Sequence, residues 1–378
     1  MSVWTLGSLA AACGGILQGA PADTPVTGVS IDTRTLKPGE VYFAIQGVSM
    51  DGHQFVPMAL EAGASAVVVS SGDSTPAIRV NDVLDAMGRA GVAARARLGA
   101  DVPVVAVTGS VGKTGTKEML KLAFGEGTHA SAASFNNHWG VPLTLARMPS
   151  DADAGIFEIG MNHAGEITPL TKMVSPTIAI ITTVAPVHLE FFESVEGIAD
   201  AKAEIFSGLK PGGTAIIPAD NPHFERLRCA AEAVGAKIIT FGSDNADVRL
   251  LSFDPLSGAA LASVMGETVS FTLAGAAHNA RNALTVLAAL EAAGLPADGA
   301  AQLAQWELPK GRGRRVPLKT TGGEALLIDE AYNANPASMA AAIQALGATP
   351  AQRRIAIVGD MLELGETSAE LHRGLAPE

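Results

Sequence analysis

One short stretch has the residue types and spacing of a phosphate-binding loop. In VVAVTGSVGKTGTKEML, residues 104–120, an apolar run that predicts a buried strand leads into glycines, a lysine, a threonine and a helical pattern. Glycines let backbone N–H groups surround an anion, the helix start adds partial positive charge, the lysine reaches the outer phosphates and the hydroxyl meets Mg²⁺. The common pattern has an earlier glycine where this chain has Val107, so the shorter form is present. The predicted loop comprises Gly109, Ser110, Val111, Gly112, Lys113 and Thr114.

Three further polar residues follow apolar runs. Glu158 ends GIFEIG, His188 follows TTVAP, and Lys202 lies in GIADAKAEIFSGL. Taken singly, each has an ordinary explanation: a surface acid, a hydrogen-bonded loop histidine and a lysine whose stem covers apolar surface while its charge reaches water. Taken together, Glu158, His188 and the Thr114 hydroxyl are oxygen and nitrogen ligands that suit Mg²⁺ beside phosphates better than zinc. This combination favours phosphoryl transfer over storage of a nucleotide.

Two asparagines open a later helical pattern. In HNARNAL, Asn279 and Asn282 are three residues apart and therefore share one helix face. Two carboxamides there can bind the edge of a base, and capping of the helix by Asn279 is an equally simple explanation. Further on, the arginines between 311 and 315 suit an anion or an interdomain joint, and DEAYNANPAS reads as a loop that starts a helix.

Composition limits the kinds of partner. The 378 residues carry a formal net charge of -12 and are 48% hydrophobic, which argues against a nucleic-acid partner and against disorder. Cys13 and Cys229 are the only cysteines, too few for a disulfide framework or a structural zinc site, so we expect a reducing cytoplasm. No apolar run approaches the roughly 20 residues that a membrane-spanning helix needs. We therefore expect no membrane insertion.

The elements that must position these residues predict an α/β protein of three domains. Residues 1–82 alternate short apolar runs with turns, which indicates a small α/β domain. Residues 83–310 alternate strands and helices, as in VPVVAVT, GIFEIG, TIAIITTV, GTAIIP and AKIITF, so we expect a parallel sheet with its ligand at the carboxyl ends of the strands. Beyond the linker PKGRGRRVPLK, the stretches ALLIDEAYNANP and RRIAIVGDMLELG predict two more strand-then-loop units. We expect 311–378 to be an incomplete third domain.

The order of these motifs resembles the Mur ligases of peptidoglycan synthesis. GVSIDTRTLKPGEVYFAIQGVSMDGHQF is similar to the family's nucleotide-sugar-binding first domain, and TGSVGKT to its phosphate loop. The stretches that follow in the family's order are SFNNHWGVPLTL, FEIGMNHAGEI, HLEFF, AKAEIF, HNARNAL, DEAYNANPAS and GDMLELG. The resemblance covers the chain nearly end to end. It implies a small α/β first domain, a central ATPase domain with a phosphate loop and a truncated, Rossmann-like third domain.

The resemblance also implies roles for the residues of the central domain. Lys113 and Thr114 would meet the ATP phosphates and Mg²⁺, and Glu158 and His188 would bind metal. In similar enzymes the lysine of AKAEIF is carbamylated, so Lys202 would become a carboxylate-like metal ligand. Lys113, Lys202 and His188 are thereby expected to be catalytic.

Further contacts are implied for ATP and for the first substrate. Asn279 and Asn282 are similar to the adenine-contacting pair, and Asn137 resembles a site residue near the phosphate loop. The third domain would contribute ribose and phosphate contacts from Arg312 or Arg314 and from the turn between Asp329 and Tyr332. The UDP part would be met by Asp32, Thr33, Arg34, Gly52 and His53, with Thr33 where the family more often has serine.

The activity that the resemblance implies is ATP-dependent formation of an amide bond. DEAYNANP stands where the ligase that adds the third amino acid would have a DYAHTP-like stretch, which favours the member that joins D-Ala-D-Ala to UDP-MurNAc-tripeptide. ATP and Mg²⁺ are the expected cofactors, and a monomer is expected. Two alternatives stay open: a folylpolyglutamate synthetase-like sibling and a non-catalytic nucleotide-binding protein of the same fold.

Overall fold

The computed structural model describes residues 2–47, 49–132, 134–187, 189–242, 245–308, 310–321 and 323–376. Contacts divide the chain into two compact units. The first comprises Met1–Val104, Gly127–Ile159 and Lys172–Ser175, and the second comprises Val105–Glu126, Gly160–Thr171 and Pro176–Glu378.

The first unit contains a five-stranded sheet in the order β2-β7-β6-β5-β4. Strands β4, β5, β6 and β7 are parallel, and β2 is antiparallel to β7. The elements of residues 4–96 are β1 (Trp4–Thr5), α1 (Leu6–Cys13), β2 (Ile16–Gln18), β3 (Pro25–Val26), β4 (Gly28–Ser30), β5 (Glu40–Phe43), η1 (Gly52–Phe55), α2 (Val56–Glu61), β6 (Ala66–Val69), β7 (Ala77–Arg79) and α3 (Val83–Ala96). Two further parallel strands of this unit, β9 (Thr128–Ala130) and β10 (Ala154–Glu158), flank α5 (Gly140–Ala146).

Both faces of the five-stranded sheet are covered, which explains its uninterrupted apolar strands. Along β6, Val68 faces a core with α1, α3 and α5, whereas Val67 and Val69 face the core under α2. Because successive side chains point to opposite faces, a strand buried on both sides is apolar at every position. The parallel pairing of β4, β5 and β6 brings their carboxyl ends to one edge of the sheet.

Helix α3 is tied to its surroundings by a buried arginine near its end. Asp82 caps the start of the helix by accepting a hydrogen bond from the Asp85 N–H. Arg95, only 5% exposed, donates from Nε to the Val174 carbonyl (2.8 Å) and from Nη2 to the Ser175 carbonyl (2.9 Å). Burial lowers the pKa of the Arg95 guanidinium. Its two carbonyl partners provide acceptors for a charge withdrawn from water.

The second unit is built on a mostly parallel sheet. Its strands follow the order β16-β15-β14-β13-β12-β11-β8. The elements are β8 (Val104–Thr108), α4 (Lys113–Phe124), α6 (Ile167–Val174), β11 (Ile178–Ile181), α7 (Val195–Ala203), η2 (Glu204–Gly208), β12 (Thr214–Pro218), α8 (Phe224–Ala233), β13 (Lys237–Gly242), β14 (Val248–Phe253), β15 (Ala259–Val264), β16 (Glu267–Thr272), α9 (Ala277–Ala292), η3 (Ala297–Gln305), β17 (Arg314–Thr320), β18 (Gly323–Asp329), α10 (Pro336–Ala348), η4 (Gly365–Thr367) and α11 (Ser368–Arg373).

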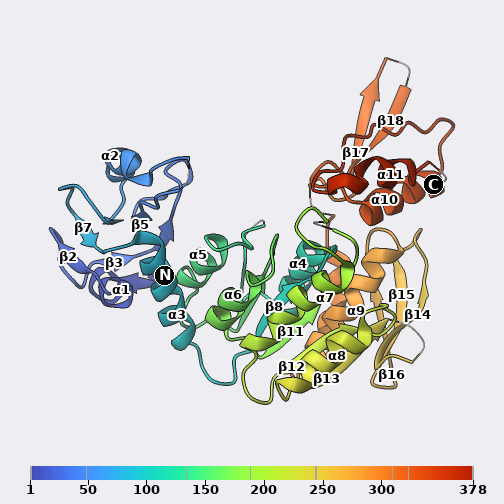
Figure 1. The fold of residues 1–378 in the computed structure, drawn as a ribbon, viewed down its shortest axis with the longest axis horizontal. Helices are drawn as coiled ribbons and strands as arrows, with labels where there is room; N and C mark the ends of the chain where they lie inside the picture. Colours follow the sequence, from blue (N-terminus) through green and yellow to red (C-terminus); the bar gives the residue numbers. More distant parts are fainter. Residues whose placement is uncertain are drawn as a thin grey trace. The chain divides into compact units, whose positions relative to one another are not determined.

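The predicted α/β class with a parallel central sheet is confirmed. Strands β8, β11, β12 and β13 are parallel and correspond to the apolar runs read from the sequence. The alternation of strands and helices expected up to residue 310 is interrupted, however, because β14, β15 and β16 form an antiparallel meander without intervening helices. Figure 1 shows these three strands together beside β13 and α9.

Of the two strand-then-loop units expected after residue 310, the first strand forms and the second does not. Strand β18 forms as expected, but it pairs antiparallel with β17, so these strands make a hairpin. No strand is assigned in 351–361, where Ile355, Ile357 and Val358 are 61%, 94% and 63% exposed. A strand requires a neighbour to pair its backbone, and the described residues provide none for this apolar stretch.

Two other features bear on the class of protein. None of the helices in the described residues is long and apolar enough to cross a membrane. Both cysteines are free thiols: Cys13 is buried and Cys229 is exposed. Burial raises the pKa of the Cys13 thiol to about 12, so it acts as a small apolar core residue.

Arg95→Met should destabilise the first unit. The substitution keeps an apolar stem but leaves the carbonyls of Val174 and Ser175 without their charged donor, so we expect the free energy of unfolding to fall by about 2–4 kcal/mol. Urea denaturation measures this loss.

The matched control is Arg89→Met on the same helix. Arg89 pairs with Asp85 (3.1 Å) while 45% exposed, and such a surface pair contributes less than about 1 kcal/mol. Equal losses in the two variants would contradict the role given to Arg95.

Candidate functional site

The phosphate-binding loop lies where two parallel strands end. Strand β8 pairs with β11, with Thr108 opposite Ile181. The Ser110 N–H donates to the Thr183 carbonyl (2.9 Å), and the Thr182 hydroxyl donates to the Val111 carbonyl (2.6 Å). The residues that follow β11 therefore hold the loop in place from one side.

Two positions in the loop require glycine. Gly109 has a φ of 148°, and a Cβ built on it would overlap the Thr182 hydroxyl. Gly112 has a φ of 89°, and its Cβ would lie 2.8 Å from Asn282 Oδ1. Both conformations are rare for other residues, and both glycines let the backbone pass close to a neighbouring side chain. The glycines noted in the sequence thus have a steric reason.

Helix α4 begins directly after the loop with its two functional side chains. Gly112 is the N-cap, and Lys113 and Thr114 form the first turn. Lys113 Nζ donates to the Gly109 carbonyl (2.6 Å), across the loop, and Thr114 is 6% exposed. A helix start with a lysine folded over a glycine loop is suited to bind the phosphates of an anionic ligand.

A cavity of about 340 Å³ opens beside this loop within the second unit. The predicted residues that line it are Ser110, Val111, Gly112, Lys113, Thr114, Asn279, Asn282, Arg312 and Tyr332. The structure thus brings the loop, the start of α9 and the segment after residue 310 to one cavity. Gly109, Arg314 and Asp329 are not among its lining residues.

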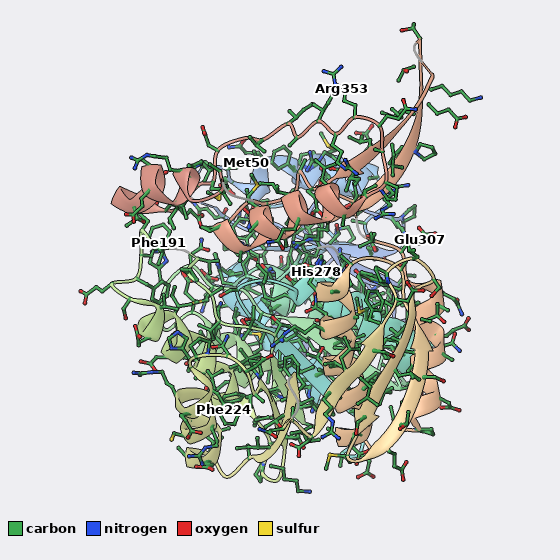
Figure 2. All side chains as sticks on the ribbon, turned by 90° about the vertical axis from the view of Figure 1, so that its right-hand side faces the viewer. Met50, Phe191, Phe224, His278, Glu307 and Arg353 are labelled. Atoms are coloured by element: carbon green, nitrogen blue, oxygen red, sulfur yellow. The ribbon has the colours of Figure 1, made fainter. Side chains whose placement is uncertain are left out.

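Asn279 and Asn282 at the start of α9 both line the cavity, and Asn279 also stabilises the start of the helix. Asn279 Oδ1 accepts the Ala276 N–H (2.9 Å), so its carboxamide also stabilises the helix start. His278, labelled in Figure 2, lies in the same first turn, lines the cavity, and has its pKa lowered by burial. The base-binding and capping explanations for Asn279 are therefore compatible, because the amide nitrogen is a separate donor.

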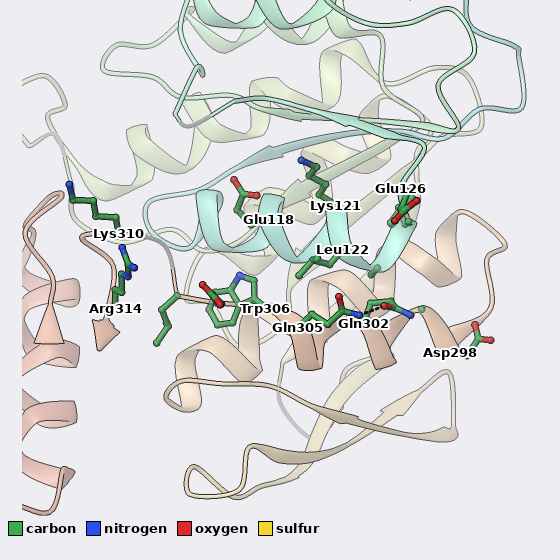
Figure 3. A pocket seen from close by; sticks show the side chains of 16 residues that line it. Glu118, Lys121, Leu122, Glu126, Asp298, Gln302, Gln305, Trp306, Lys310 and Arg314 are labelled. Atoms are coloured by element: carbon green, nitrogen blue, oxygen red, sulfur yellow. Dashed lines mark hydrogen bonds between the residues drawn. The ribbon is translucent and has the colours of Figure 1, made fainter. Parts of the chain in front are cut away.

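Arg312 and Arg314, the two candidate arginines after residue 310, line different hollows. Arg312 lies 4.2 Å from the centre of the Tyr332 ring, and both line the cavity. Arg314 instead lines a second hollow, of about 1090 Å³, shown in Figure 3. Asp329 accepts the N–H groups of Gly311 (3.1 Å) and Ala331 (3.2 Å), so its carboxylate shapes the turns around the cavity.

Lys202 is buried, contrary to the interpretation of a surface lysine with its charge in water. It lies in α7 and is 2% exposed. Burial lowers the pKa of its ammonium well below the usual range, and the positive charge of Lys113 lowers it further. Both effects disfavour the charged form of this side chain.

The remaining predicted metal ligands are only partly described. Glu158, 1% exposed at the end of β10 in the first unit, accepts a hydrogen bond from Asn136 Nδ2 (2.8 Å). Asn137, predicted as a site residue, uses Oδ1 to accept the N–H groups of Trp139 and Gly140, which orders the start of α5. His188 lies outside the described residues. In the part of the chain that is described, no group of three or more His, Cys, Asp and Glu residues could hold a metal ion.

The predicted UDP contacts lie after parallel strands of the first unit. Asp32 and Arg34 follow β4 and form a bidentate pair, with the Arg34 side chain 86% exposed. Hydrogen bonding to Arg34 lowers the pKa of the Asp32 carboxyl. Gly52 and His53 open η1, and His53 Nδ1 lies 2.7 Å from Asp51. Thr33 contacts Met58, its hydroxyl 3.4 Å from the sulfur.

Sequence reasoning missed several residues that line the cavity. They are Thr182, Thr183, His278, Arg281, Trp306, Glu330, Asn333 and Asn335. The position of Thr182 and Thr183 after an apolar strand was a usable signal, because ligands gather at such ends. Partial desolvation raises the pKa of the Glu330 carboxyl, against the lowering effect of Arg312. Arg281 pairs with Asp220, which no sequence spacing indicates.

Three protein-family descriptions match this chain in succession. The Mur ligase family catalytic domain matches residues 25–101, the Mur ligase middle domain matches 107–290, and the Mur ligase glutamate ligase domain matches 313–378. Together they include the phosphate loop, the start of α9 and the turn from Asp329 to Tyr332.

Relatives of known name are similar over nearly the whole chain. The UDP-N-acetylmuramoyl-tripeptide--D-alanyl-D-alanine ligase of Synechocystis sp. is 36% identical over 358 residues, which cover 93% of this chain and 76% of the relative. A crystal structure of MurF from Acinetobacter baumannii superposes with a TM-score of 0.86 at 31% identity, over 98% of this chain and 82% of that one. MurF from Thermotoga maritima in complex with ADP has a TM-score of 0.76 at 26% identity, over 92% and 81%.

Gly109→Ala should weaken binding of a nucleoside triphosphate by about 5- to 160-fold. A side chain at this φ would strain the backbone and push against Thr182, at a cost of roughly 1–3 kcal/mol, and 1.4 kcal/mol corresponds to tenfold in affinity. Titration calorimetry measures the change. Gly347→Ala in α10, where an added Cβ meets nothing within 4 Å, is the control. Unchanged affinity in a folded Gly109→Ala variant would remove this loop from the binding site.

Proposed function

This chain belongs to the Mur ligase family, and we propose that it joins D-Ala-D-Ala to UDP-MurNAc-tripeptide with ATP as the second substrate. It is an ATP-dependent ligase of peptidoglycan precursors. The observation that carries the proposed substrates is identity of 36% over nearly the whole chain to a ligase named for them. The cavity beside the phosphate loop supports ATP as the ligand.

In the proposed reaction, the γ-phosphoryl group of ATP passes to the C-terminal carboxylate of the tripeptide, and ADP leaves. The amine of D-Ala-D-Ala then attacks the acyl phosphate. A C–N bond forms, the amine loses a proton, the C–O bond to phosphate breaks, and inorganic phosphate leaves. Both steps develop negative charge on phosphoryl oxygens, so the protein must supply fixed positive charge and N–H donors there.

The phosphate loop is the proposed source of that charge. Lys113 would exchange the Gly109 carbonyl, 2.6 Å away, for phosphate oxygens. The loop of Gly109, Ser110, Val111 and Gly112 would surround the phosphates, with the Ser110 N–H kept on the Thr183 carbonyl and the other backbone N–H groups turned to the ligand. The start of α4 would add its partial charge. Because Thr182 and Thr183 already hold the loop, little reorganisation is needed when ATP binds.

The same cavity offers groups for the rest of ATP. We propose that Asn279 and Asn282 contact the base, and that Arg312 and Tyr332 contact the ribose and phosphates. Arg312 is preferred to Arg314 because it lines the cavity. Asp329 would act by shaping the turn at Gly311, to which it is hydrogen-bonded.

The donor set of this protein fits Mg²⁺. Thr114 offers a buried hydroxyl, Glu158 a buried carboxylate, and Lys202 a buried amine that would become an anionic ligand on carbamylation. His188 is the fourth proposed ligand. Hard oxygen donors of this kind are preferred by Mg²⁺, which when bound would neutralise charge on the phosphates.

Carbamylation of Lys202 is supported by its surroundings. An ammonium at a site 2% exposed is costly, and the adjacent charge of Lys113 opposes it further. When the neutral Nζ attacks CO₂, an N–C bond forms and one proton leaves, which gives a carbamate anion. The same Lys113 charge that disfavours the ammonium would then stabilise the modified side chain. We propose Lys202, Lys113 and His188 as the catalytic residues.

The first substrate is proposed to bind in the first unit. Asp32, Thr33, Arg34, Gly52 and His53 follow parallel strands or lie close beyond them, and Arg34 is exposed enough to meet a diphosphate. We also propose that Asn137, which orders the start of α5, contacts the substrate.

We propose three domains: 1–82 for the UDP substrate, 83–310 for ATP, and 311–378 as part of a Rossmann-like third domain. We further propose a monomer in a reducing cytoplasm, where both cysteines stay as thiols. The net charge of -12 argues against a nucleic-acid partner.

Phosphate release tests the proposed function. It should require UDP-MurNAc-tripeptide and D-Ala-D-Ala together with ATP. A folylpolyglutamate synthetase-like enzyme would instead respond to a folate and glutamate, and a non-catalytic protein would respond to neither pair. Phosphate release that does not depend on D-Ala-D-Ala would refute D-Ala-D-Ala as the amine substrate.

Lys113→Ala should lower turnover at least about 100-fold while the protein stays folded. Loss of one preorganised charge contact to the reacting phosphate has this scale. Lys121→Ala, an exposed lysine two turns further along α4, is the control and should keep turnover near that of the wild type. A Lys113→Ala variant with a near-normal rate would exclude this loop from catalysis.

Lys202 should carry a carbamate in protein equilibrated with bicarbonate. We expect ¹³C-bicarbonate to give a carbamate carbon resonance in the wild type that Lys202→Ala lacks, while Lys172→Ala, which removes an exposed lysine, keeps it. Turnover of Lys202→Ala should fall and should not recover with added bicarbonate. An unmodified Lys202 in fully active protein would refute the modification.

A further inference from the structure

Trp306 lines the cavity, and the proposed reaction gives it no role. It follows η3, is 3% exposed, and lines the cavity together with Gly115, Asn279 and Asn282. Its ring lies close to the first turns of α4, since a Cβ added to Gly115 would be 3.9 Å from Trp306 Cζ2. Figure 3 shows the same side chain among the residues that line the second hollow.

The indole N–H of Trp306 is buried without an acceptor. Among the described residues, Nε1 has no hydrogen-bond partner. Leaving a buried donor unsatisfied is costly, and most buried donors in proteins are paired. Trp4 provides the contrast within this chain, because its Nε1 is also buried and donates to the Ala146 carbonyl at 2.8 Å. The two buried tryptophans therefore differ in whether the protein itself provides an acceptor.

We propose that Trp306 is a base-recognition residue of the nucleotide site, whose Nε1–H donates to a ring nitrogen of the purine. This inference rests on the proposed use of ATP. Purine rings carry unprotonated nitrogens on their edges, and an indole offers one donor next to a flat apolar face that suits a base. The phosphates are provided for by residues 110–114, which line the same cavity. The asparagines proposed for the base line the cavity with Trp306.

If the Trp306 Nε1–H donates to the base, its removal should weaken ATP binding. Removal of the N–H from a tryptophan that only fills the core should leave ATP binding unchanged. A neutral hydrogen bond contributes about 0.5–1.5 kcal/mol, which corresponds to about 2- to 12-fold in affinity. Replacing Trp306 by phenylalanine keeps a large aromatic ring and removes the donor. The ligand-free protein should lose little by this change, because no partner is given up there.

The first arm of the test compares Trp306→Phe with Trp4→Phe in ligand-free protein. Trp4→Phe leaves the Ala146 carbonyl unpaired and should lower the melting temperature by about 2–8 °C, whereas Trp306→Phe should lower it by less than about 2 °C. Trp306→Phe should bind ATP about 2- to 12-fold more weakly, and Trp4→Phe should bind ATP as the wild type does. Wild-type ATP affinity in Trp306→Phe, or a melting loss as large as that of Trp4→Phe, would overturn the proposal in favour of a core tryptophan or one bonded to trapped water.

The second arm identifies the acceptor with 1-deaza-, 3-deaza- and 7-deaza-ATP, each of which replaces one ring nitrogen by C–H. One of the three should bind the wild type about 2- to 12-fold more weakly than ATP and should bind Trp306→Phe with no further loss. Equal losses in both proteins for every analogue would refute the contact.

Failure of this inference is distinguishable from failure of the proposed function. If ATP does not bind the wild type, the proposed function itself fails. If ATP binds and Lys113→Ala abolishes turnover while Trp306→Phe behaves as the wild type, only the assignment of Trp306 is wrong.

Discussion

The parallel register between β8 and β11 is the constraint on which the site depends. With Thr108 opposite Ile181, the chain leaving β8 must pass directly beside Thr182, and only a glycine at 109 leaves room for that passage. The threonines after β11 then accept and donate hydrogen bonds that hold the loop, so α4 starts with Lys113 at a defined place. A shift of one residue in this register would turn every side chain of the strand to the opposite face and would remove the hydroxyl that anchors Val111.

Much of the central sheet was predictable because burial on both faces leaves uninterrupted apolar runs. Strands β8, β11, β12 and β13 carry such runs, and the polar residues after them were rightly sought at the strand ends. The meander β14–β16 was missed because its strands are only partly buried and alternate polar and apolar residues in a region expected to continue the βαβ pattern. The stretch 353–358 has strand-like residues, but pairing partners belong to the fold and cannot be read from propensity.

In the site, the types of residue were more predictable than the direction of individual side chains. The motif containing two adjacent asparagines did not reveal that Asn136 bonds to Glu158 while Asn137 orders a helix start. Similarly, the spacing of Arg312 and Arg314 around Gly313 did not reveal that only Arg312 lines the cavity, while Arg314 begins β17. Local spacing gave Lys202 the pattern of a surface lysine, whereas the folded chain leaves it only 2% exposed.

The hydrogen bond between Lys113 and the Gly109 carbonyl has a consequence for the thermodynamics of ligand capture. A lysine that swings freely in solvent loses up to about 2 kcal/mol of rotamer entropy when a ligand immobilises it. Here Lys113 Nζ is already held 2.6 Å from the Gly109 carbonyl oxygen. The rotamer entropy of the side chain was therefore lost when the chain folded. When a phosphate binds, Lys113 therefore exchanges a neutral carbonyl acceptor for a charged one. The favourable enthalpy of the stronger hydrogen bond is not offset by a further loss of side-chain entropy.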